Sequence, residues 1–290
     1  MRISSATYGR FKSVLKGRMV ASKRKGGQNM NIVVCLKQIP DLVYIRVKDR
    51  KPILEGAPLI FGEMDRNALE EAVRIKERVE GTKVIAVAMG GAKLKEGIKG
   101  ALAIGADEAV LLTDPLLANS DTAGTANAIA KAIEKIEGYG LILCGEGSTD
   151  NYSGQVGPRL AELLNLPQIT YVRKLEINGN KIKAVRNMEE SFEVVEAEMP
   201  ALVTVANEIN QPRLALLKDI LKAGRKPVKD LKVADLGLSG DAAGVKGSIR
   251  EIISNLAPEQ ARKHVVFEGD LKDVVDNLVN ALTKEGVLGR

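Results

Sequence analysis

The chain has 290 residues, of which 45% are hydrophobic and 28% are charged, enough for one large domain or two smaller ones with a buried core. Aromatic residues make up 3% and tryptophan is absent, which argues against stacking platforms for single-stranded nucleic acid. Two cysteines and one histidine disfavour a disulfide framework, a metal centre and a Ser-His-Asp triad, and no apolar run reaches the roughly 18 residues that cross a bilayer.

The formal net charge of +6 is concentrated at the amino end. Residues 1–30 contain eight basic residues and no acidic one, and without them 35 basic residues face 37 acidic ones, a net charge of −2. The body therefore gives no reason to expect a nucleic-acid partner. Because the segment lacks the apolar core of a secretory signal, we interpret residues 1–29 as a dispensable basic extension. We expect a cytoplasmic protein without a membrane span. Association with a membrane-bound partner is compatible with this expectation.

Four short, continuously apolar runs predict strands that are buried on both faces. They occupy residues 32–36, 83–88, 109–112 and 141–144. Helical spacing of apolar residues recurs between them, over 67–80, 94–104 and 121–136. Ser120 or Asp121 is a candidate cap for the third helix. Strands that alternate with such helices predict βαβ units and a doubly wound, mostly parallel α/β sheet of the Rossmann-like kind, which we assign to residues 30–227.

The pattern changes after about residue 166. Asn178-Gly179 between alternating runs indicates a hairpin, so residues 168–206 are expected to form an antiparallel extension that returns to the sheet near 201–205. Residues 228–290 are poor in core positions and end in two amphipathic segments. The predicted helices are 248–255 and 271–284. We therefore interpret residues 228–290 as a C-terminal arm that packs on a partner subunit.

Loops at the carboxyl ends of parallel strands are the expected ligand site of such a sheet. The Gly-rich or polar ones are 89–91, 114–120 and 145–158, and the last enters a predicted helix over 159–164. Free amides at that helix start, with the helix dipole, suit a phosphate. Gly154 and Gly157 permit close backbone approach, while Ser153 and Gln155 offer hydrogen bonds. Asp150 is better suited to cap the loop or hold a ribose hydroxyl, since like charges repel.

Plainer interpretations remain open for each motif. A Gly-rich loop can be simply a turn, and Gly145-x-Gly147 is followed by Asp150 where the dinucleotide fingerprint needs glycine. No Gly-Lys-Ser/Thr phosphate loop is present, which disfavours common dehydrogenases and NTPases. Cys35 and Cys144 suit small core positions, and His264 suits an ordinary surface or interface position.

Six segments carry recognisable motifs in a consistent order. They are Asn31–Asp41, Ala68–Lys76, Ala101–Asp107, Asp150–Pro158, Asn210–Lys222 and Ala234–Gly237. Together these segments span about residues 31–237 and resemble the β subunit of electron transfer flavoproteins. The resemblance implies a heterodimer with an α subunit, in which this chain binds an adenine nucleotide and is redox-active only within the αβ complex.

The resemblance also implies the residues that contact the nucleotide. They are Cys35, Gly62, Glu63, Met64, Asp65, Met89, Gly90, Thr122, Thr125, Gly145, Glu146, Gly147, Ser148, Thr149, Asp150, Asn151, Tyr152, Ser153, Gly154, Gln155, Val156, Gly157 and Pro158. Many relatives have Asn-Pro where this chain has Gly62-Glu63, so an asparagine side-chain contact is lost there. Leu216 and Leu217 correspond to a loop that some relatives use to dock partner dehydrogenases.

Two kinds of β subunit occur in this family. Ordinary electron carriers hold structural AMP, whereas electron-bifurcating relatives hold a second FAD, which takes hydride from NADH and divides the electrons between two acceptors. Residues 155–158, 120–125 and 39–41 resemble the bifurcating kind. We therefore expect FAD, with AMP as the alternative.

The expected partners follow from the same resemblance. They are the α subunit, NADH, a low-potential acceptor such as ferredoxin, and a quinone oxidoreductase or acyl-CoA dehydrogenase. The alternative function is a non-bifurcating carrier with structural AMP that docks dehydrogenases. An adenine-nucleotide sensor or hydrolase and a pure scaffold are rival hypotheses. Abundant lysine and glutamate with few aromatics is typical of a thermophile.

Overall fold

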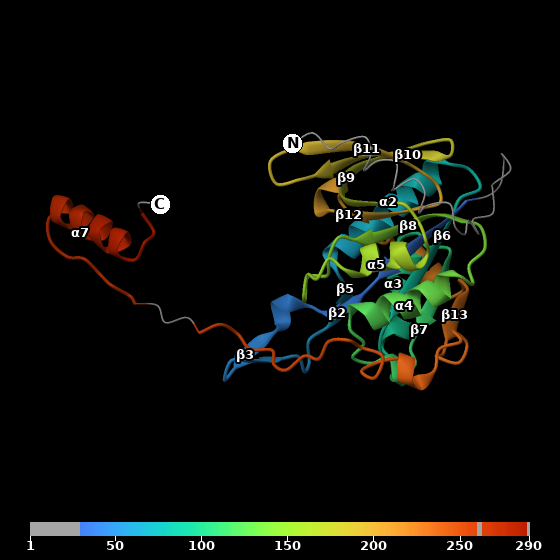
Figure 1. The fold of residues 1–290 in the computed structure, drawn as a ribbon, viewed down its shortest axis with the longest axis horizontal. Helices are drawn as coiled ribbons and strands as arrows, with labels where there is room; N and C mark the ends of the chain where they lie inside the picture. Colours follow the sequence, from blue (N-terminus) through green and yellow to red (C-terminus); the bar gives the residue numbers. More distant parts are fainter. Residues whose placement is uncertain (1–29, 260–262, 289–290) are drawn as a thin grey trace, which may run out of the picture. The chain divides into compact units, whose positions relative to one another are not determined.

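The computed structural model describes residues 30–259 and 263–288, so the basic extension 1–29 lies outside the described residues (Figure 1). The chain divides into two compact units. The larger contains the described residues up to Ile45 together with Leu54–Ile253, and the smaller contains Arg46–Ile53 and the described residues from Ser254 onward. The nucleotide-site residues predicted from sequence all belong to the larger unit.

A nine-stranded sheet forms the centre of the larger unit. Its order is β11-β10-β9-β12-β8-β1-β6-β7-β13. The strands are β1 (Asn31–Leu36), β6 (Lys83–Met89), β7 (Glu108–Leu112), β8 (Tyr139–Gly145), β9 (Gln168–Asn178), β10 (Lys181–Asn187), β11 (Phe192–Glu198), β12 (Ala201–Val205) and β13 (Val228–Leu231). The seven strands β9-β12-β8-β1-β6-β7-β13 run parallel to one another. At the other edge, β10 pairs antiparallel with both β9 and β11. The predicted fold class, a mostly parallel α/β sheet with an antiparallel extension, is confirmed.

Helices cover both faces of this sheet (Figure 1). The helices of the larger unit are α2 (Glu63–Arg78), α3 (Leu94–Ile104), α4 (Thr122–Ile133), α5 (Val156–Leu163) and α6 (Leu217–Ala223). Apolar residues of α2 and α3 share one core with side chains such as Val34, while α4 and α5 share the opposite core with neighbours such as Val33. The alternation along β1 explains its continuous apolar run, because both faces of the strand are buried.

Two helices begin earlier than the sequence pattern indicated. α2 begins at Glu63 rather than Asn67, since Gly62 is its N-cap and acidic side chains in the first turn suit the helix dipole. α5 begins at Val156 rather than Arg159, so Pro158 lies in its first turn, where a missing amide hydrogen costs nothing. The predicted cap of α4 is confirmed, because the Asp121 carboxylate accepts hydrogen bonds from the amides of Ala123 and Gly124.

Several short elements escaped the sequence pattern, because three-residue strands and single turns have too little periodicity to be recognised. They are β2 (Gln38–Pro40) paired with β5 (Leu59–Phe61), β3 (Arg46–Lys48) paired with β4 (Lys51–Ile53), and the 3-10 turns Leu42–Tyr44, Pro115–Leu117, Asn207–Ile209 and Gly240–Ala242. The β3–β4 hairpin belongs to the smaller unit.

The segment after residue 227 differs in two ways from the expected arm. β13 pairs with β7 at the edge of the main sheet, and the larger unit continues to Ile253. The predicted helix over 248–255 is wrong: this segment has no helix. Tertiary contacts hold the start of this segment: the Ile249 amide donates to Asp121 Oδ2 at 3.0 Å, and Ser248 Oγ accepts from the Asp121 amide at 2.8 Å.

The second predicted C-terminal helix is present as α7 (Leu271–Lys284), which lies in the smaller unit and is capped by Asp270. None of its residues is buried. Among the described residues, no helix is both long and apolar enough to span a membrane.

Candidate functional site

The candidate site lies where the central parallel strands β1 and β8 end side by side. Val34 of β1 is in register with Leu143 of β8, so Lys37 and Gly145 leave the sheet at the same edge. The first turn of α2 and the loop after β8 meet there, and the loop enters α5. Gly62 and Thr149 approach each other at this edge, since a Cβ on Gly62 would be 4.0 Å from Thr149 Oγ1.

Asp65 is the buried centre of this junction. Its Oδ2 accepts a 2.6 Å hydrogen bond from the Lys37 amide, and the Gly145 amide also donates to the carboxylate. Burial raises the pKa of Asp65 from 3.8 to about 7, although both amides and the Lys37 charge oppose the rise. Gly145 has no space for a side chain, because a Cβ would lie 2.8 Å from Asp65 Oδ1. Asp65 therefore ties the ends of two central strands to α2.

An ion pair connects the same strand end to the glycine-rich loop. Lys37 Nζ lies 2.6 Å from Asp150 Oδ2 and 2.8 Å from Oδ1, and 3.4 Å from Ser148 Oγ. Burial alone would raise the pKa of Asp150, but hydrogen bonds from Lys37 and Ser148 hold it below its ordinary value. Sequence reasoning missed Lys37, whose one available signal was its position directly after a predicted strand.

The loop between β8 and α5 is held by its own contacts. The Glu146 amide donates to Val205 O of β12 at 3.0 Å, and the Tyr152 amide donates to Ser148 O at 2.8 Å. The Tyr152 hydroxyl donates to the Glu146 carboxylate, which raises the pKa of Tyr152 to about 12. A Cβ on Gly147 would lie 3.2 Å from the Tyr152 ring, so glycine lets the ring fold over the loop.

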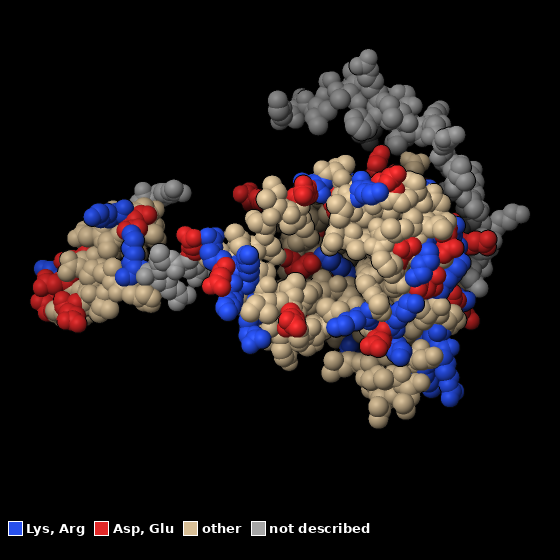
Figure 2. Space-filling model, turned by 90° about the horizontal axis from the view of Figure 1, so that it is seen from below, with Lys and Arg blue, Asp and Glu red and all other residues tan. Residues whose placement is uncertain are grey.

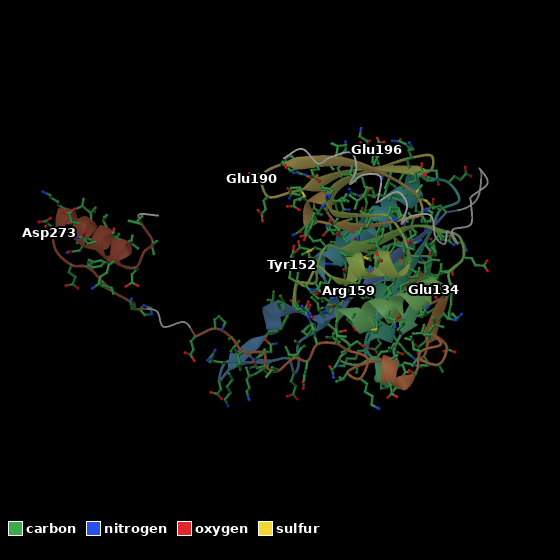
Figure 3. The ribbon with its side chains drawn as sticks, viewed as in Figure 1. Glu134, Tyr152, Arg159, Glu190, Glu196 and Asp273 are labelled. Atoms are coloured by element: carbon green, nitrogen blue, oxygen red, sulfur yellow. The ribbon has the colours of Figure 1, made fainter. Side chains whose placement is uncertain are left out.

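The start of α5 has the character of an anion site. Among the residues that the structure describes, no side chain caps this helix end, in contrast to the Asp121 cap of α4. Gln155 Oε1 instead accepts from Thr122 Oγ1 and from Arg159 Nη2, both at 3.0 Å, which links the starts of α4 and α5. Tyr152 of the loop and Arg159 of α5 are labelled in Figure 3. The uncapped amides leave the helix end free for an anionic ligand.

Two glycines near this helix have different roles. Gly154 has φ +63°, a conformation that glycine adopts without strain, and the nearest atom to a Cβ there would be Glu146 O at 3.6 Å. At Gly157 a Cβ would lie 2.6 Å from Thr204 Cγ2 of β12. The missing side chain of Gly157 thus serves the packing of α5 on the sheet.

Cys35 and Cys144 occupy neighbouring positions near the ends of β1 and β8, and both are buried free thiols. The hydrogen bond to Cys35 and burial raise the pKa of the Cys144 thiol. Both belong to the core shared with α4 and α5, in agreement with the small-core interpretation.

The remaining predicted residues are distributed around this edge. The Gly90 amide, after β6, donates to Leu112 O at 3.1 Å, and Met89 packs partly buried against the α4–α5 core. Thr125 lies one turn after Thr122 in α4. Leu216 and Leu217 are exposed at the start of α6, which packs on α3.

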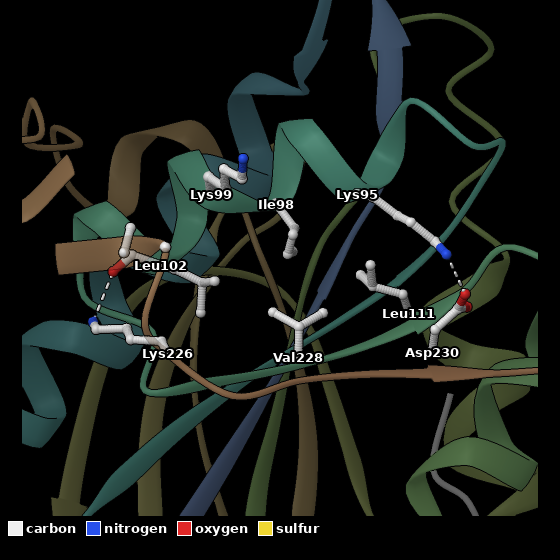
Figure 4. Close-up of a pocket in the computed structure, with 10 residues that line it drawn as sticks. Lys95, Ile98, Lys99, Leu102, Leu111, Lys226, Val228 and Asp230 are labelled. Atoms are coloured by element: carbon white, nitrogen blue, oxygen red, sulfur yellow. Dashed lines mark hydrogen bonds and ion pairs between the residues drawn. The ribbon is translucent and has the colours of Figure 1, made fainter. Parts of the chain in front are cut away.

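A separate cavity of about 230 Å³ lies between α3, β7 and β13 (Figure 4). Ile98, Leu111 and Val228 line it, with the Lys95–Asp230 ion pair at 2.8 Å. Its volume is below that of most ligand pockets, and none of the predicted nucleotide residues lines it.

On the surface seen in Figure 2, acidic and basic side chains are interspersed.

Comparison with known proteins decides the family. The model of the electron transfer flavoprotein domain matches residues 53–236. The chain belongs to the electron transfer flavoprotein family. It is 42% identical to the electron transfer flavoprotein subunit beta of Thermoanaerobacterium thermosaccharolyticum over 89% of this chain and 100% of the relative. Identity to the subunit beta of Clostridium acetobutylicum is 38%, over 88% and 99% of the two chains.

A third relative is the caffeyl-CoA reductase-Etf complex subunit CarD of Acetobacterium woodii, 34% identical over 89% of this chain and 100% of the relative. These full-length matches confirm the resemblance to electron transfer flavoprotein β subunits. Membership implies an α-subunit partner and association with a flavin or nucleotide.

Proposed function

We propose that this chain is the β subunit of a bifurcating electron transfer flavoprotein that binds FAD at the ends of β1 and β8. When bound there, the flavin would supply the two-electron and one-electron redox chemistry that would couple oxidation of NADH to reduction of the α-subunit flavin and of a low-potential acceptor such as ferredoxin. The non-bifurcating alternative holds structural AMP and docks dehydrogenases. In either case we expect a cytoplasmic complex.

The uncapped start of α5, reached through the glycine-rich loop, is the observation that carries this proposal. Free amides at Val156 and Gly157 suit a phosphate or diphosphate, and the left-handed backbone at Gly154 shapes the loop that precedes them. The residues present therefore fit the phosphate group of an adenine nucleotide. Their task is to bind and orient, and the proposed function requires no side-chain acid or base.

The choice of FAD over AMP rests on the segment Gln155–Pro158. Its sequence resembles that of bifurcating relatives, and Gln155 links the starts of α4 and α5 through Thr122. CarD, whose name places it in a complex with a CoA-ester reductase, supports a CoA-ester enzyme as an electron partner of this chain.

The decisive experiment is to co-express this chain with its α subunit, purify the complex, denature it and quantify the released cofactors. Two FAD per αβ complex, with bleaching of flavin absorbance on addition of NADH, support the bifurcating function. One FAD with one AMP, and no bleaching by NADH, supports the non-bifurcating alternative. Release of neither adenylate nor flavin contradicts both.

A further inference from the structure

Lys37 brings a positive charge to the candidate nucleotide site, although neither the loop motifs nor the family resemblance assigned it a contact. Its backbone is fixed, because its amide donates to Asp65 at 2.6 Å immediately after β1. Its side chain reaches the loop after β8, where it pairs with Asp150. The two side chains are 43% and 30% exposed, so both are open to solvent and to a ligand.

We propose that Lys37 binds a phosphate oxygen of the adenine nucleotide and that Asp150 is a competing anion, which holds the lysine until the nucleotide displaces it. The proposal rests on the proposed function, since it assigns a ligand to the same site. It makes Lys37 a binding residue and Asp150 a residue that weakens binding.

The geometry around Lys37 favours exchange of Asp150 for a phosphate oxygen over a permanent ion pair with Asp150. The ammonium group has three donors, and the Asp150 carboxylate takes contacts at 2.6 and 2.8 Å, while the third neighbour, Ser148 Oγ, is at a weak 3.4 Å. One donor of Lys37 is therefore poorly used, and a phosphate oxygen would give it a charge-assisted hydrogen bond.

The negative charge of Asp150 opposes the entry of a phosphate. Its lowered pKa keeps it ionised at neutral pH, so it repels a phosphate that enters the loop. Partly exposed ion pairs contribute little to stability, so giving up the direct pair costs the fold little.

The test compares Lys37→Met and Asp150→Asn in the αβ complex after the nucleotide of this chain's site has been removed. AMP and adenosine are titrated calorimetrically into each complex. Loss of a charge-assisted hydrogen bond predicts that Lys37→Met weakens AMP binding roughly tenfold to a hundredfold and changes adenosine binding less than about twofold. Asp150→Asn should strengthen AMP binding on the order of threefold to tenfold. Lys37→Arg should retain most of the affinity.

Lys83 provides a matched control. It forms a partly exposed ion pair with Glu108 at 3.1 Å and lies at the start of β6, the opposite end of the parallel strands. Lys83→Met removes the same charge and should leave AMP affinity unchanged. The melting temperature of every complex is measured to verify that each variant is folded.

The outcomes separate this inference from the proposed function. If wild-type complex binds AMP and Lys37→Met binds it equally well, the inference is wrong and the proposed function stands. If Lys37→Met and Asp150→Asn weaken AMP and adenosine alike, the pair is only structural and the inference is again wrong. A wild-type complex that binds neither AMP nor FAD overturns the proposed function and this inference with it.

Discussion

Asp65 shows at the scale of one residue how burial and hydrogen bonding compete. Two backbone amides favour its ionised form, yet desolvation dominates and raises its pKa to about 7. The groups that face it are Lys37 and Asp150 from the neighbouring loops and the Cys144 thiol of β8. A carboxyl group with a raised folded-state pKa stabilises the fold below its unfolded pKa, near 4, and this contribution is lost as pH rises through about 7.

Asp65→Asn should therefore remove a pH dependence. A shift of this size corresponds to at most about 4 kcal/mol across the titration. Relative to the Asp65→Asn variant, the wild-type αβ complex should lose stability between about pH 4 and pH 7, because only the wild type must ionise a buried carboxyl. Melting temperatures at several pH values measure this difference. A difference in melting temperature between the two proteins that stays constant with pH would contradict the raised pKa of Asp65.

At the scale of the element, the packing of α5 on β12 depends on one glycine. Gly157→Ala would place a methyl group 2.6 Å from Thr204 Cγ2, so we expect destabilisation of about 1–3 kcal/mol. Gly100→Ala is the matched control, since it lies in α3 with no atom within 4 Å of its Cβ position and should stabilise slightly.

The source of this effect can be verified by a second substitution. Adding Thr204→Ser to Gly157→Ala removes the threonine methyl group that the new alanine side chain would strike, and should recover much of the lost stability. Urea unfolding of the αβ complex gives the comparison. If Gly157→Ala and Gly100→Ala shift the midpoint equally, steric contact with β12 is not the reason for glycine at this position.

The segment after β12 is a second element held by tertiary contacts. Arg213 pairs with Glu70 at 2.8 Å and with Glu77 at 2.5 Å, and Glu70 is 2% exposed. Hydrogen bonds from Arg213 and Arg74 hold the pKa of Glu70 below its ordinary value even though burial opposes this. The ion pairs fix the chain just before the exposed residues Leu216 and Leu217, which the resemblance predicts to dock partners.

Arg213→Met should leave the buried Glu70 carboxylate with Arg74 as its remaining ion-pair partner. We expect a loss of at least about 2 kcal/mol, because a buried charge is left poorly compensated. Lys131→Met, which breaks an exposed pair with Glu134, should change stability by less than about 0.5 kcal/mol. Equal shifts of the urea midpoint by the two substitutions would show that the burial of Glu70 does not increase the cost of losing its ion-pair partner.

At the scale of the whole molecule, the smaller unit has an amphipathic helix without a buried face. The apolar positions of α7 recur at helical spacing: Leu271, Val275, Leu278, Val279 and Leu282. Exposed apolar surface of this kind marks an interaction site, and we propose the α subunit as the partner.

Val275→Asp with Leu278→Asp should therefore reduce co-purification with the α subunit while the larger unit stays folded, because its core lies elsewhere. Asp276→Asn on the same helix is the control and should leave association intact. Gel filtration of the co-expressed subunits measures the outcome. Unchanged complex formation by the double variant would place the interface away from α7.

The local pattern of apolar and turn residues was sufficient to predict the main strands and helices. Runs such as 32–36 and 141–144 predicted β1 and β8 because a strand buried on both faces is apolar at every position, and Asn178-Gly179 predicted the β9–β10 turn. Residues 248–255 have an equally local amphipathic pattern but form no helix, and tertiary contacts with Asp121, more than a hundred positions earlier, hold the start of this segment.

The sequence by itself determined the sheet except for β13, the covering helices α2 to α5, and the family, since periodicity and motifs are properties of neighbouring residues. The tertiary structure alone decided that Lys37 meets Asp150, that Asp65 is buried between two strand ends, and that Gly157 faces Thr204. The physical reason is separation along the chain: Asp150 comes 113 positions after Lys37. Only the parallel register of β1 and β8 brings their loops together.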